Sequence, residues 1–377
     1  MPRRPPSSTT AATASLRPTS TEVARLAGVS RTTVSFVLNG VMDKGISEAT
    51  RERVLEAARE LGYEPNAVAR SLAGGATGTI ALVIPRAEHL YVDAFLAQLV
   101  ASINDEAHHH GLKLLIESTE DEGREPGGFM QLVRSRRIDG LIVANLRTAE
   151  VEHLQQLREG GLPLVVFGCE LPDARRFHTM GDDTWASAQM AVGHLIGLGH
   201  QRIGFVNYGS PELHSAAQRE RGWREALRQH GIGIDPAWVV NADVSADSGY
   251  RAAQQLLARN TGITALFAGN DTVAFGALRA LREAGLRVPE DIAVVGYDDV
   301  PLAGFATPPL TTVHTDPIAH GRLAVRLLTA QLRGEDARAL APLPAPTLVV
   351  RDSCGAASAG GRRGPLSPQG RRRRNAG

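Results

Sequence analysis

Residues 20–40 read STEVARLAGVSRTTVSFVLNG, and this stretch carries the strongest local pattern in the chain. Its first half places three small apolar residues on one face of a short helix, namely Val23, Ala24 and Ala27. Gly28 follows where the chain must turn sharply, and Ser30 is placed to cap a second helix. The pattern predicts two short helices joined by a tight turn, as in a helix-turn-helix.

The second of these helices is expected to have an apolar inner face and a polar outer face. Val34, Val37 and Leu38 form the inner stripe, whereas the residues near its start would point into a DNA major groove. The candidate base and phosphate contacts are Ser30, Arg31, Thr32, Thr33, Ser35, Phe36 and Asn39. A plain helical hairpin without DNA contacts is the alternative that this stretch alone leaves open.

A third helix is predicted from the Ser47 cap to Gly62, with an apolar stripe of Val54, Leu55, Ala58 and Leu61. Residues 64–75 then open with Pro65, which is tolerated in a first helical turn, and end in two glycines. Three short helices around a core of Val, Leu and Ala suit a small all-α head.

From Thr79 onward, apolar runs of strand length alternate with stretches of helical period. The runs are residues 80–84, 112–116, 141–143, 164–167, 203–206, 238–240, 265–267 and 292–295. Such runs imply parallel strands that are buried on both faces. Eight of them exceed one ordinary sheet, so the sequence predicts an α/β body of two doubly wound parallel-sheet lobes.

The composition fits a soluble chain of 377 residues, with 43% hydrophobic and 21% charged residues. No stretch reaches the length of a membrane-spanning helix, and the first twenty residues lack a secretory apolar segment. The only cysteines, Cys169 and Cys354, lie far apart, which indicates a reduced compartment. The ends of the chain are basic and its middle is acidic. This charge distribution is expected of a protein whose basic head binds nucleic acid. We therefore expect a cytoplasmic protein, associated with the nucleoid when it is bound to DNA.

The head and the following segment resemble the lac-repressor (LacI/GalR) family of bacterial transcriptional regulators. The resemblance rests on Ala27-Gly-Val-Ser30, Thr33-Val-Ser35, Leu61-Gly-Tyr63 and Pro65-Asn-Ala-Val-Ala-Arg-Ser-Leu-Ala73, and it extends to about Asp352. It implies a periplasmic-binding-protein-like body. It also implies that the protein is a ligand-responsive transcriptional repressor that binds DNA sequence-specifically. Phe36 departs from the family, because many relatives carry a polar or basic reader there.

The resemblance also implies that residues 66–72 form a hinge helix, which orders when two copies meet on DNA. This helix would enter the minor groove, with Leu72 as an apolar wedge that partly unstacks a central base step. The implied DNA contacts in this segment are Asn66, Ala69, Arg70 and Leu72.

Three segments of the body resemble the ligand-binding corners of the family. Residues 215–223 look like its cleft-arginine segment, with Arg219 facing the ligand, and Asn270 and Asp298 occupy hydrogen-bonding positions in the other two. An arginine, an asparagine and an aspartate in one cleft suit a polyhydroxylated molecule such as a sugar.

Two stretches of the body depart from the family pattern. Val244 stands where many relatives place an aromatic ring that stacks on the ligand. The loop after the first strand, residues 85–95, also differs, and its polar residues could restore contacts to the ligand. The ligand-binding candidates are therefore Arg86, Tyr91, Asp93, Arg219, Val244, Asn270 and Asp298.

The sequence contains no convincing catalytic grouping. It lacks a Gly-x-x-x-x-Gly-Lys phosphate loop and a Gly-x-Ser-x-Gly elbow, and the consecutive His108-His-His110 cannot share one helix face to bind a metal. We expect a regulator that needs no cofactor or metal. The alternatives are a solute-binding receptor of a transporter, which would have a similar body, and a sugar-processing enzyme.

These patterns predict a chain of five parts. They are a disordered arm (1–17), a DNA-binding head (18–64), a hinge helix and linker (65–75), a two-lobed body (76–352) and a disordered Arg-rich tail (353–377). Lobe 1 would comprise about 76–180 and 315–343, and lobe 2 about 181–314 and 344–352. The tail has no leucine heptad of the kind carried by family tetramers, so we expect a homodimer. Its expected partners are a pseudo-palindromic DNA operator and an effector that is a sugar or sugar derivative, and no membrane partner is expected.

Overall fold

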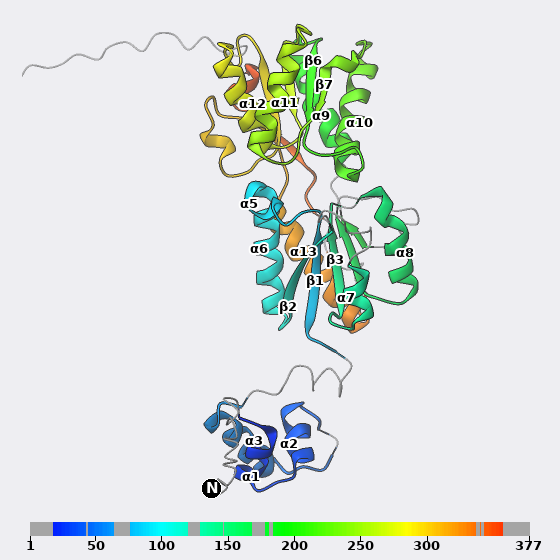
Figure 1. Cartoon of the computed structure of the whole chain (residues 1–377), viewed down its shortest axis with the longest axis vertical. Coiled ribbons are helices and arrows are strands. Elements are labelled where there is room, and N and C mark those ends of the chain that lie inside the picture. Colours follow the sequence, from blue (N-terminus) through cyan, green and yellow to red (C-terminus); the bar gives the residue numbers. More distant parts are fainter. Residues whose placement is uncertain are drawn as a thin grey trace, which may run out of the picture. The chain divides into compact units, whose positions relative to one another are not determined.

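The computed structural model describes residues 18–42, 44–63, 76–119, 129–145, 147–167, 178–180, 184–336, 340 and 343–356. The chain divides into two compact units, residues 1–77 and 78–377, and each is considered by itself (Figure 1). No described helix combines the length and the apolar character that a membrane span requires.

The first unit, the head, contains three helices: α1 (Ser20–Ala27), α2 (Arg31–Leu38) and α3 (Glu48–Glu60). Each begins at a residue whose hydroxyl accepts a backbone N–H of the first turn, namely Thr19, Ser30 and Ser47. Gly28 ends α1 at a φ of 66°, a left-handed conformation that glycine adopts without strain. The small core of the head consists of Val23, Ala24, Ala27, Val34, Val37, Val54, Ala57 and Ala58. The predicted helix-turn-helix is thus confirmed.

Lobe 1 of the second unit is built on a five-stranded parallel sheet of order β2-β1-β3-β4-β5. The strands are β1 (Thr79–Ile84), β2 (Lys113–Ser118), β3 (Gly140–Ala144), β4 (Leu164–Phe167) and β5 (His178–Met180). One hydrophobic cluster joins one face of this sheet to α6 (Ala94–His109) and α13 (Pro317–Arg333). A second cluster joins the other face to α7 (Met130–Arg134) and α8 (Val151–Glu159).

Lobe 2 is built on a six-stranded sheet of order β11-β10-β9-β8-β6-β7. Its strands are β6 (Ile203–Asn207), β7 (Val239–Asn241), β8 (Ala265–Ala268), β9 (Ala293–Asp298), β10 (Thr311–His314) and β11 (Thr347–Val349), of which only β11 is antiparallel to its neighbour. The helices pack in pairs, α9 (Thr184–Gly197) with α10 (His214–Gln229) and α11 (Ala246–Ala258) with α12 (Asp271–Glu283). Two doubly wound lobes were predicted, and the structure has them.

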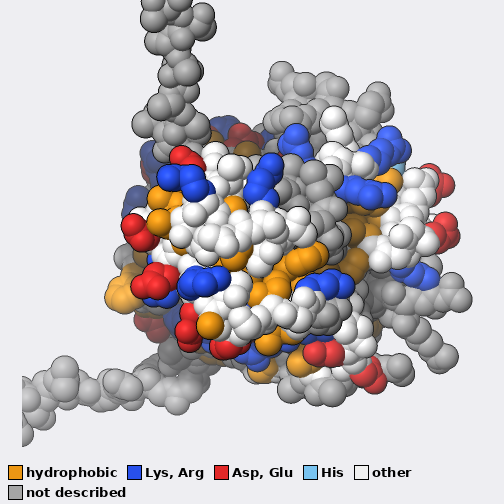
Figure 2. Space-filling model, turned by 90° about the horizontal axis from the view of Figure 1, so that it is seen from below, with side chains coloured by type: hydrophobic (Ala, Val, Ile, Leu, Met, Phe, Trp, Pro, Cys, Tyr) orange, Lys and Arg blue, Asp and Glu red, His pale blue; other side chains and the backbone are white. Residues whose placement is uncertain are grey.

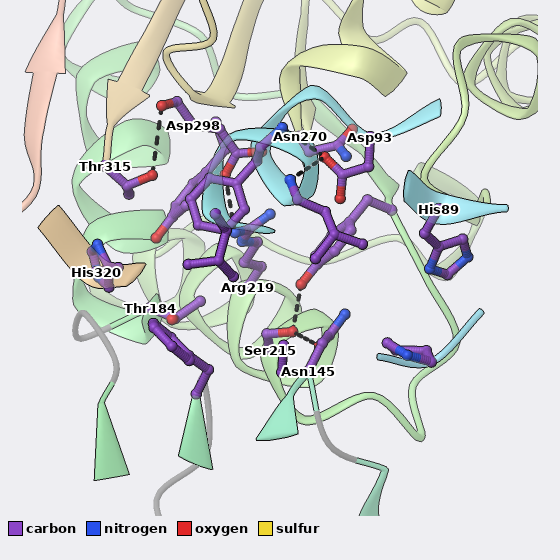
Figure 3. A pocket seen from close by; sticks show the side chains of 18 residues that line it. His89, Asp93, Asn145, Thr184, Ser215, Arg219, Asn270, Asp298, Thr315 and His320 are labelled. Atoms are coloured by element: carbon purple, nitrogen blue, oxygen red, sulfur yellow. Dashed lines mark hydrogen bonds and ion pairs between the residues drawn. The ribbon is translucent and has the colours of Figure 1, made fainter. Parts of the chain in front are cut away.

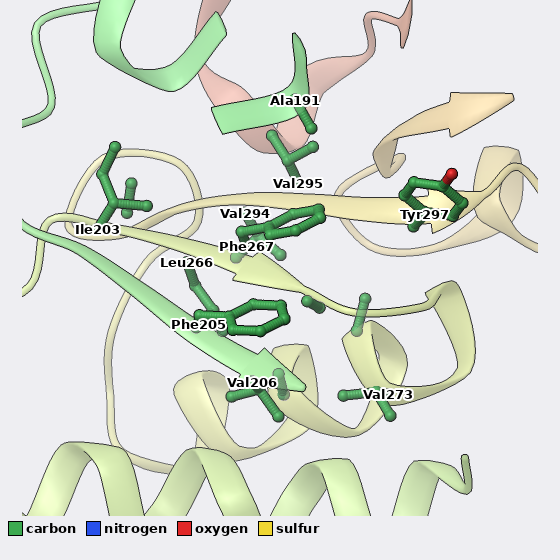
Figure 4. Packing of buried hydrophobic residues seen from close by; sticks show 14 of the residues in the cluster. Ala191, Ile203, Phe205, Val206, Leu266, Phe267, Val273, Val294, Val295 and Tyr297 are labelled. Atoms are coloured by element: carbon green, nitrogen blue, oxygen red, sulfur yellow. The ribbon is translucent and has the colours of Figure 1, made fainter. Parts of the chain in front are cut away.

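Aromatic packing anchors the core of lobe 2. Phe205 on β6 stacks on Phe267 of β8 and on Trp223 of α10, with ring centroids 5.3 and 5.9 Å apart (Figure 4). The Trp223 indole also donates a hydrogen bond to the Ile203 carbonyl, at 3.1 Å. This packing fixes α10, which carries Arg219, against the sheet.

The folded chain extends beyond the predicted start of the tail at residue 353. Ser353 and Cys354 are buried in a short 3₁₀ turn, Asp352–Cys354. The Ser353 hydroxyl donates to the Val294 carbonyl at 2.7 Å and accepts the Thr311 N–H at 2.8 Å. Ser353 belongs to lobe 2 because its hydroxyl satisfies buried backbone groups of β9 and β10, a role that composition does not reveal.

Candidate functional site

A cavity of about 110 Å³ lies between the lobes, where the carboxyl ends of the strands face one another (Figure 3). Ligands of doubly wound sheets bind at this edge. Lobe 1 and α13 contribute Pro85, His89, Asp93, Phe95, Leu96, Leu99, Ala144, Asn145, Phe167, Thr315 and His320. Lobe 2 contributes Thr184, Tyr208, Ser215, Arg219, Asn270, Tyr297 and Asp298. The lobe 1 side of the cavity therefore combines apolar and polar side chains, and the lobe 2 side is polar and aromatic.

Arg219 is the central cation of this cavity and is only 8% exposed. Its guanidinium lies 4.3 Å from the ring centre of Tyr208 and 3.6 Å from that of Tyr297, so an aromatic face stabilises it on each side. It donates to the Gly269 carbonyl and lies 3.4 Å from Asp298 Oδ1. Its buried Nε has no hydrogen-bond partner among the described residues, which leaves a donor for a ligand oxygen.

One buried carboxyl group, Asp298, and one half-buried carboxyl group, Asp93, share the cavity with this guanidinium. Asp298 ends β9, and burial raises its pKa well above the ordinary value, although Arg219 opposes the shift. Asp93 caps α6 through Oδ1, which accepts the N–H groups of Phe95 and Leu96, and burial raises the pKa of this carboxyl as well. A carboxyl that can hold or release a proton can donate to or accept from a hydroxyl group.

A chain of hydrogen bonds crosses from lobe 2 to lobe 1 beside Arg219. The Tyr208 hydroxyl donates to Ser215 Oγ, and the Ser215 hydroxyl donates to Asn145 Oδ1. Asn145 directly follows β3 and has a φ of 57°, a left-handed conformation that asparagine tolerates better than most residues. None of these three residues was among the predicted ligand-binding candidates, although Ser215 begins the cleft-arginine segment and Asn145 and Tyr208 each follow a buried strand, a signal that points to them.

Four of the seven predicted ligand-binding residues meet in the cavity: Asp93, Arg219, Asn270 and Asp298. The other three are not among the described residues that line it. Tyr91 is 80% exposed on α5 (His89–Val92), Val244 is packed in the core of lobe 2, and Arg86 forms ion pairs outside the cavity. The described residues that line the cavity include the aromatic side chains Phe95, Phe167, Tyr208 and Tyr297.

The predicted DNA contacts of the head lie on α2 and around it. Ser30, Arg31, Thr32, Ser35 and Asn39 are exposed, and Thr33 and Phe36 are half-buried. Asn66, Ala69, Arg70 and Leu72 lie outside the described residues. On the face shown in Figure 2, basic side chains are interspersed with acidic ones. The structural support for DNA binding is therefore the geometry of the helix-turn-helix.

Asp271 lies behind the cavity and supports the turn that carries Asp298. Its carboxylate accepts the Thr312 hydroxyl at 2.6 Å and the Val300 N–H at 2.9 Å. Asp298 and Asp299 have positive φ values of 112° and 56°, which are unfavourable for residues other than glycine. The bond from the Val300 N–H to Asp271 helps to hold the end of this turn in place, and the bond from Thr312 ties Asp271 to the neighbouring strand β10.

Burial raises the pKa of Asp271 from its ordinary value of 3.8 to about 7. In the unfolded chain this carboxyl ionises near pH 4, whereas in the folded chain it keeps its proton to about pH 7. Unfolding thus releases a proton between these values, so the free energy of unfolding falls as the pH rises from 4 to 7. The fall due to Asp271 amounts to roughly 4 kcal/mol.

We expect Asp271→Asn to remove this part of the pH dependence, because an amide can bond Val300 and Thr312 without titrating. Urea unfolding at pH 4 to 8 measures it, with Asp247→Asn as the control, since the Asp247 side chain is 75% exposed. Equal pH slopes for wild type and Asp271→Asn would contradict the assignment.

Residues 19–66 match the family model for bacterial regulatory proteins of the lacI family, and residues 192–354 match that for a periplasmic binding protein-like domain. The HTH-type transcriptional repressor PurR of Haemophilus influenzae (strain PittEE) is 33% identical over 316 residues, which cover 84% of this chain and 91% of PurR. PurR of Aliivibrio fischeri (strain ATCC 700601 / ES114) is 33% identical over 336 residues, 88% of this chain and 97% of that protein.

Solved structures are similar along most of the chain. The lac repressor dimer bound to operator and the anti-inducer ONPF is 30% identical with a TM-score of 0.75, over 90% of this chain and 99% of that one. The complex of the transcriptional regulator CelR with cellobiose is 34% identical with a TM-score of 0.64, over 89% of this chain and all of that one.

Proposed function

Because the chain belongs to the lacI family of bacterial regulatory proteins, we propose that it binds its DNA operator as a homodimer. Its DNA binding would be controlled by a sugar or sugar derivative that binds between its lobes. It is a DNA-binding transcriptional regulator, and its relatives are repressors, not enzymes. It would act in the cytoplasm, associated with the nucleoid while bound to DNA.

The convergence of Arg219, Asn270, Asp298 and Asp93 on one cavity carries the effector proposal. A sugar presents many hydroxyl groups, each of which donates and accepts, and a buried site must satisfy them. The carboxyls accept or donate, and the guanidinium donates through its free Nε. The apolar side chains of lobe 1, with Phe95 and Phe167, offer a surface for the C–H face of a sugar ring.

The proposed mechanism couples this cavity to the DNA through the packing of two copies. Each head would place the outer face of α2 in a major groove, and the paired hinge segments (65–75) would enter the minor groove between them. Effector binding between the lobes would change how the two first lobes pack and so whether the hinges can order. Coupling of this kind requires an element with two arrangements that both sites bias.

The decisive experiment is the selection of genomic fragments by the purified full chain at ~150 mM salt, where nonspecific phosphate binding is weakened. Recovery of a short inverted repeat is the expected result, since two identical heads read two half-sites. The selection is repeated with a pool of sugars, in case the effector is required for binding. Diffuse, salt-sensitive binding under both conditions would reject the proposed function.

Replacing Leu72 by Ala should weaken operator binding at least tenfold. Without the apolar wedge the central base step stays stacked, so the DNA is not bent and makes fewer contacts with the protein. Fluorescence anisotropy with the selected operator measures this effect. Leu26→Ala is the matched control, since Leu26 is 45% exposed on α1 of the head. Equal operator affinities for the Leu72 variant and wild type would reject the wedge.

A further inference from the structure

A second group of polar side chains lies next to the cavity, where the lobes meet. Glu88 and His89 follow β1 in lobe 1, and Asp243 follows β7 in lobe 2. One ligand atom of each residue lies within 4.8 Å of those of the other two. We propose that His89, Asp243 and Glu88 form a binding site for a divalent transition-metal ion of the zinc class that joins the two lobes.

His89 is the residue that distinguishes this group from an ordinary surface cluster. It is only 4% exposed, and its buried Nε2 makes no hydrogen bond within the described part of the chain. A buried polar atom without a good hydrogen bond is uncommon and unfavourable. Nε2 lies 3.4 Å from Asp243 Oδ1, so it is directed at a carboxylate with which it could share a cation.

The distance between His89 Nε2 and Asp243 Oδ1 suits two ligands of one ion. The two atoms are 3.4 Å apart, which is longer than a good N–H···O hydrogen bond. Zinc bonds to nitrogen and oxygen of about 2.0–2.2 Å place neighbouring ligands of a tetrahedron about 3.3–3.6 Å apart. The pair therefore has the separation of a tetrahedral edge before any metal binds, and a ligand atom of Glu88 lies within 4.8 Å of both.

The donor set selects the class of ion. Calcium and magnesium are bound by oxygen ligands, whereas an imidazole with two carboxylates suits zinc and its neighbours in the transition series. Three protein ligands leave the fourth position of a tetrahedron for water.

Arg86 is the internal competitor for this site. Its Nη1 lies 2.9 Å from Glu88 Oε1 and 3.5 Å from Asp243 Oδ2, and its side chain is 44% exposed. The guanidinium is thus the cation that now lies between the carboxylates, and it can move into solvent when a metal ion replaces it. If the cluster is a metal site, removing Arg86 should strengthen metal binding. If the cluster is only a set of ion pairs, removing Arg86 would remove its cation and would create no metal site.

An ion at this site would hold the lobes together at the edge of the cavity, which His89 also lines. Its ligands come from both lobes, so it would favour the arrangement in which the lobes are in contact. Metal binding would then raise the midpoint of thermal unfolding, since the ion binds the folded chain.

The test uses the full chain, purified in the presence of a chelator and then freed of it. Isothermal titration with Zn²⁺ measures stoichiometry and affinity, and the visible absorption of Co²⁺ reports tetrahedral coordination. We expect one saturable site per chain in wild type, loss of that site in His89→Ala and in Asp243→Asn, and tighter binding in Arg86→Ala.

His109→Ala is the matched control, because His109 is exposed at the end of α6, in a run of three histidines. Its binding should equal that of wild type. Loss of binding in His109→Ala, retention in both His89→Ala and Asp243→Asn, or absence of a saturable site in wild type would each overturn the proposal. If His89→Ala fails to fold, as judged by circular dichroism, the opposite changes expected of Asp243→Asn and Arg86→Ala decide it.

Discussion

Arg219→Ala is expected to abolish the response of operator binding to the effector and to leave operator affinity in the absence of effector unchanged. The guanidinium is buried between Tyr208 and Tyr297 and has one donor free for the ligand. Truncating one partner of a buried charge-assisted contact costs roughly 2–5 kcal/mol, which corresponds to a loss of effector affinity of about 30-fold or more. The change lies in the second unit, which does not include the residues of the head.

The fold should survive this substitution because Asp298 need not remain charged. Burial already raises the pKa of Asp298, so without Arg219 the carboxyl takes up a proton and does not remain as an unpaired buried charge. The measurement is operator binding by anisotropy, with and without the sugar that shifts the thermal midpoint of wild type most in a panel.

Arg224→Ala is the matched control for Arg219→Ala. Arg224 lies on the same helix, α10, but its side chain is 47% exposed and pairs with Glu220 one turn away. Such surface pairs contribute little, so this variant should respond like wild type. An intact effector response in Arg219→Ala would remove Arg219 from the binding site, and loss of operator binding in that variant would show that it acts on the fold.

Gly276→Ala is expected to destabilise lobe 2 by about 1–3 kcal/mol or more, although alanine is the better helix former. A methyl group at position 276 would overlap the Ala246 carbonyl oxygen and lie 2.5 Å from the Tyr250 nitrogen. Both are backbone atoms of α11, which packs directly on α12. The helices would have to separate, and the core beneath them would lose contacts.

Gly193→Ala provides the opposite expectation within the same lobe. Gly193 lies inside α9, and a Cβ there meets no atom within 4 Å. This substitution should stabilise the protein by about 0.5–1 kcal/mol, because glycine loses more conformational freedom on folding. Urea unfolding followed by circular dichroism measures both variants. If Gly276→Ala were as stable as Gly193→Ala, the close approach of α11 and α12 would not limit this position.

Much of the fold could be predicted from the sequence, because local patterns report which faces are buried. Gly28 and Ser30 marked the turn and the cap of the helix-turn-helix, and the apolar runs marked eight strands. Strand β10 was missed because it begins with Thr311 and Thr312. These threonines are buried, and their hydroxyls bond Arg351 and Asp271, so their polarity hides the strand from a search for apolar runs.

The sequence by itself determined the head, the doubly wound lobes and, through the family motifs, the polar residues Arg219, Asn270 and Asp298 of the cavity. Only the tertiary structure decided what these residues meet. It joined Ser215 to Asn145 across 70 residues, placed His89 opposite Asp243, and packed Val244 into the core. The physical reason is that periodicity and capping depend on neighbours along the chain, whereas contacts across the cleft depend on how two separately folded sheets face one another.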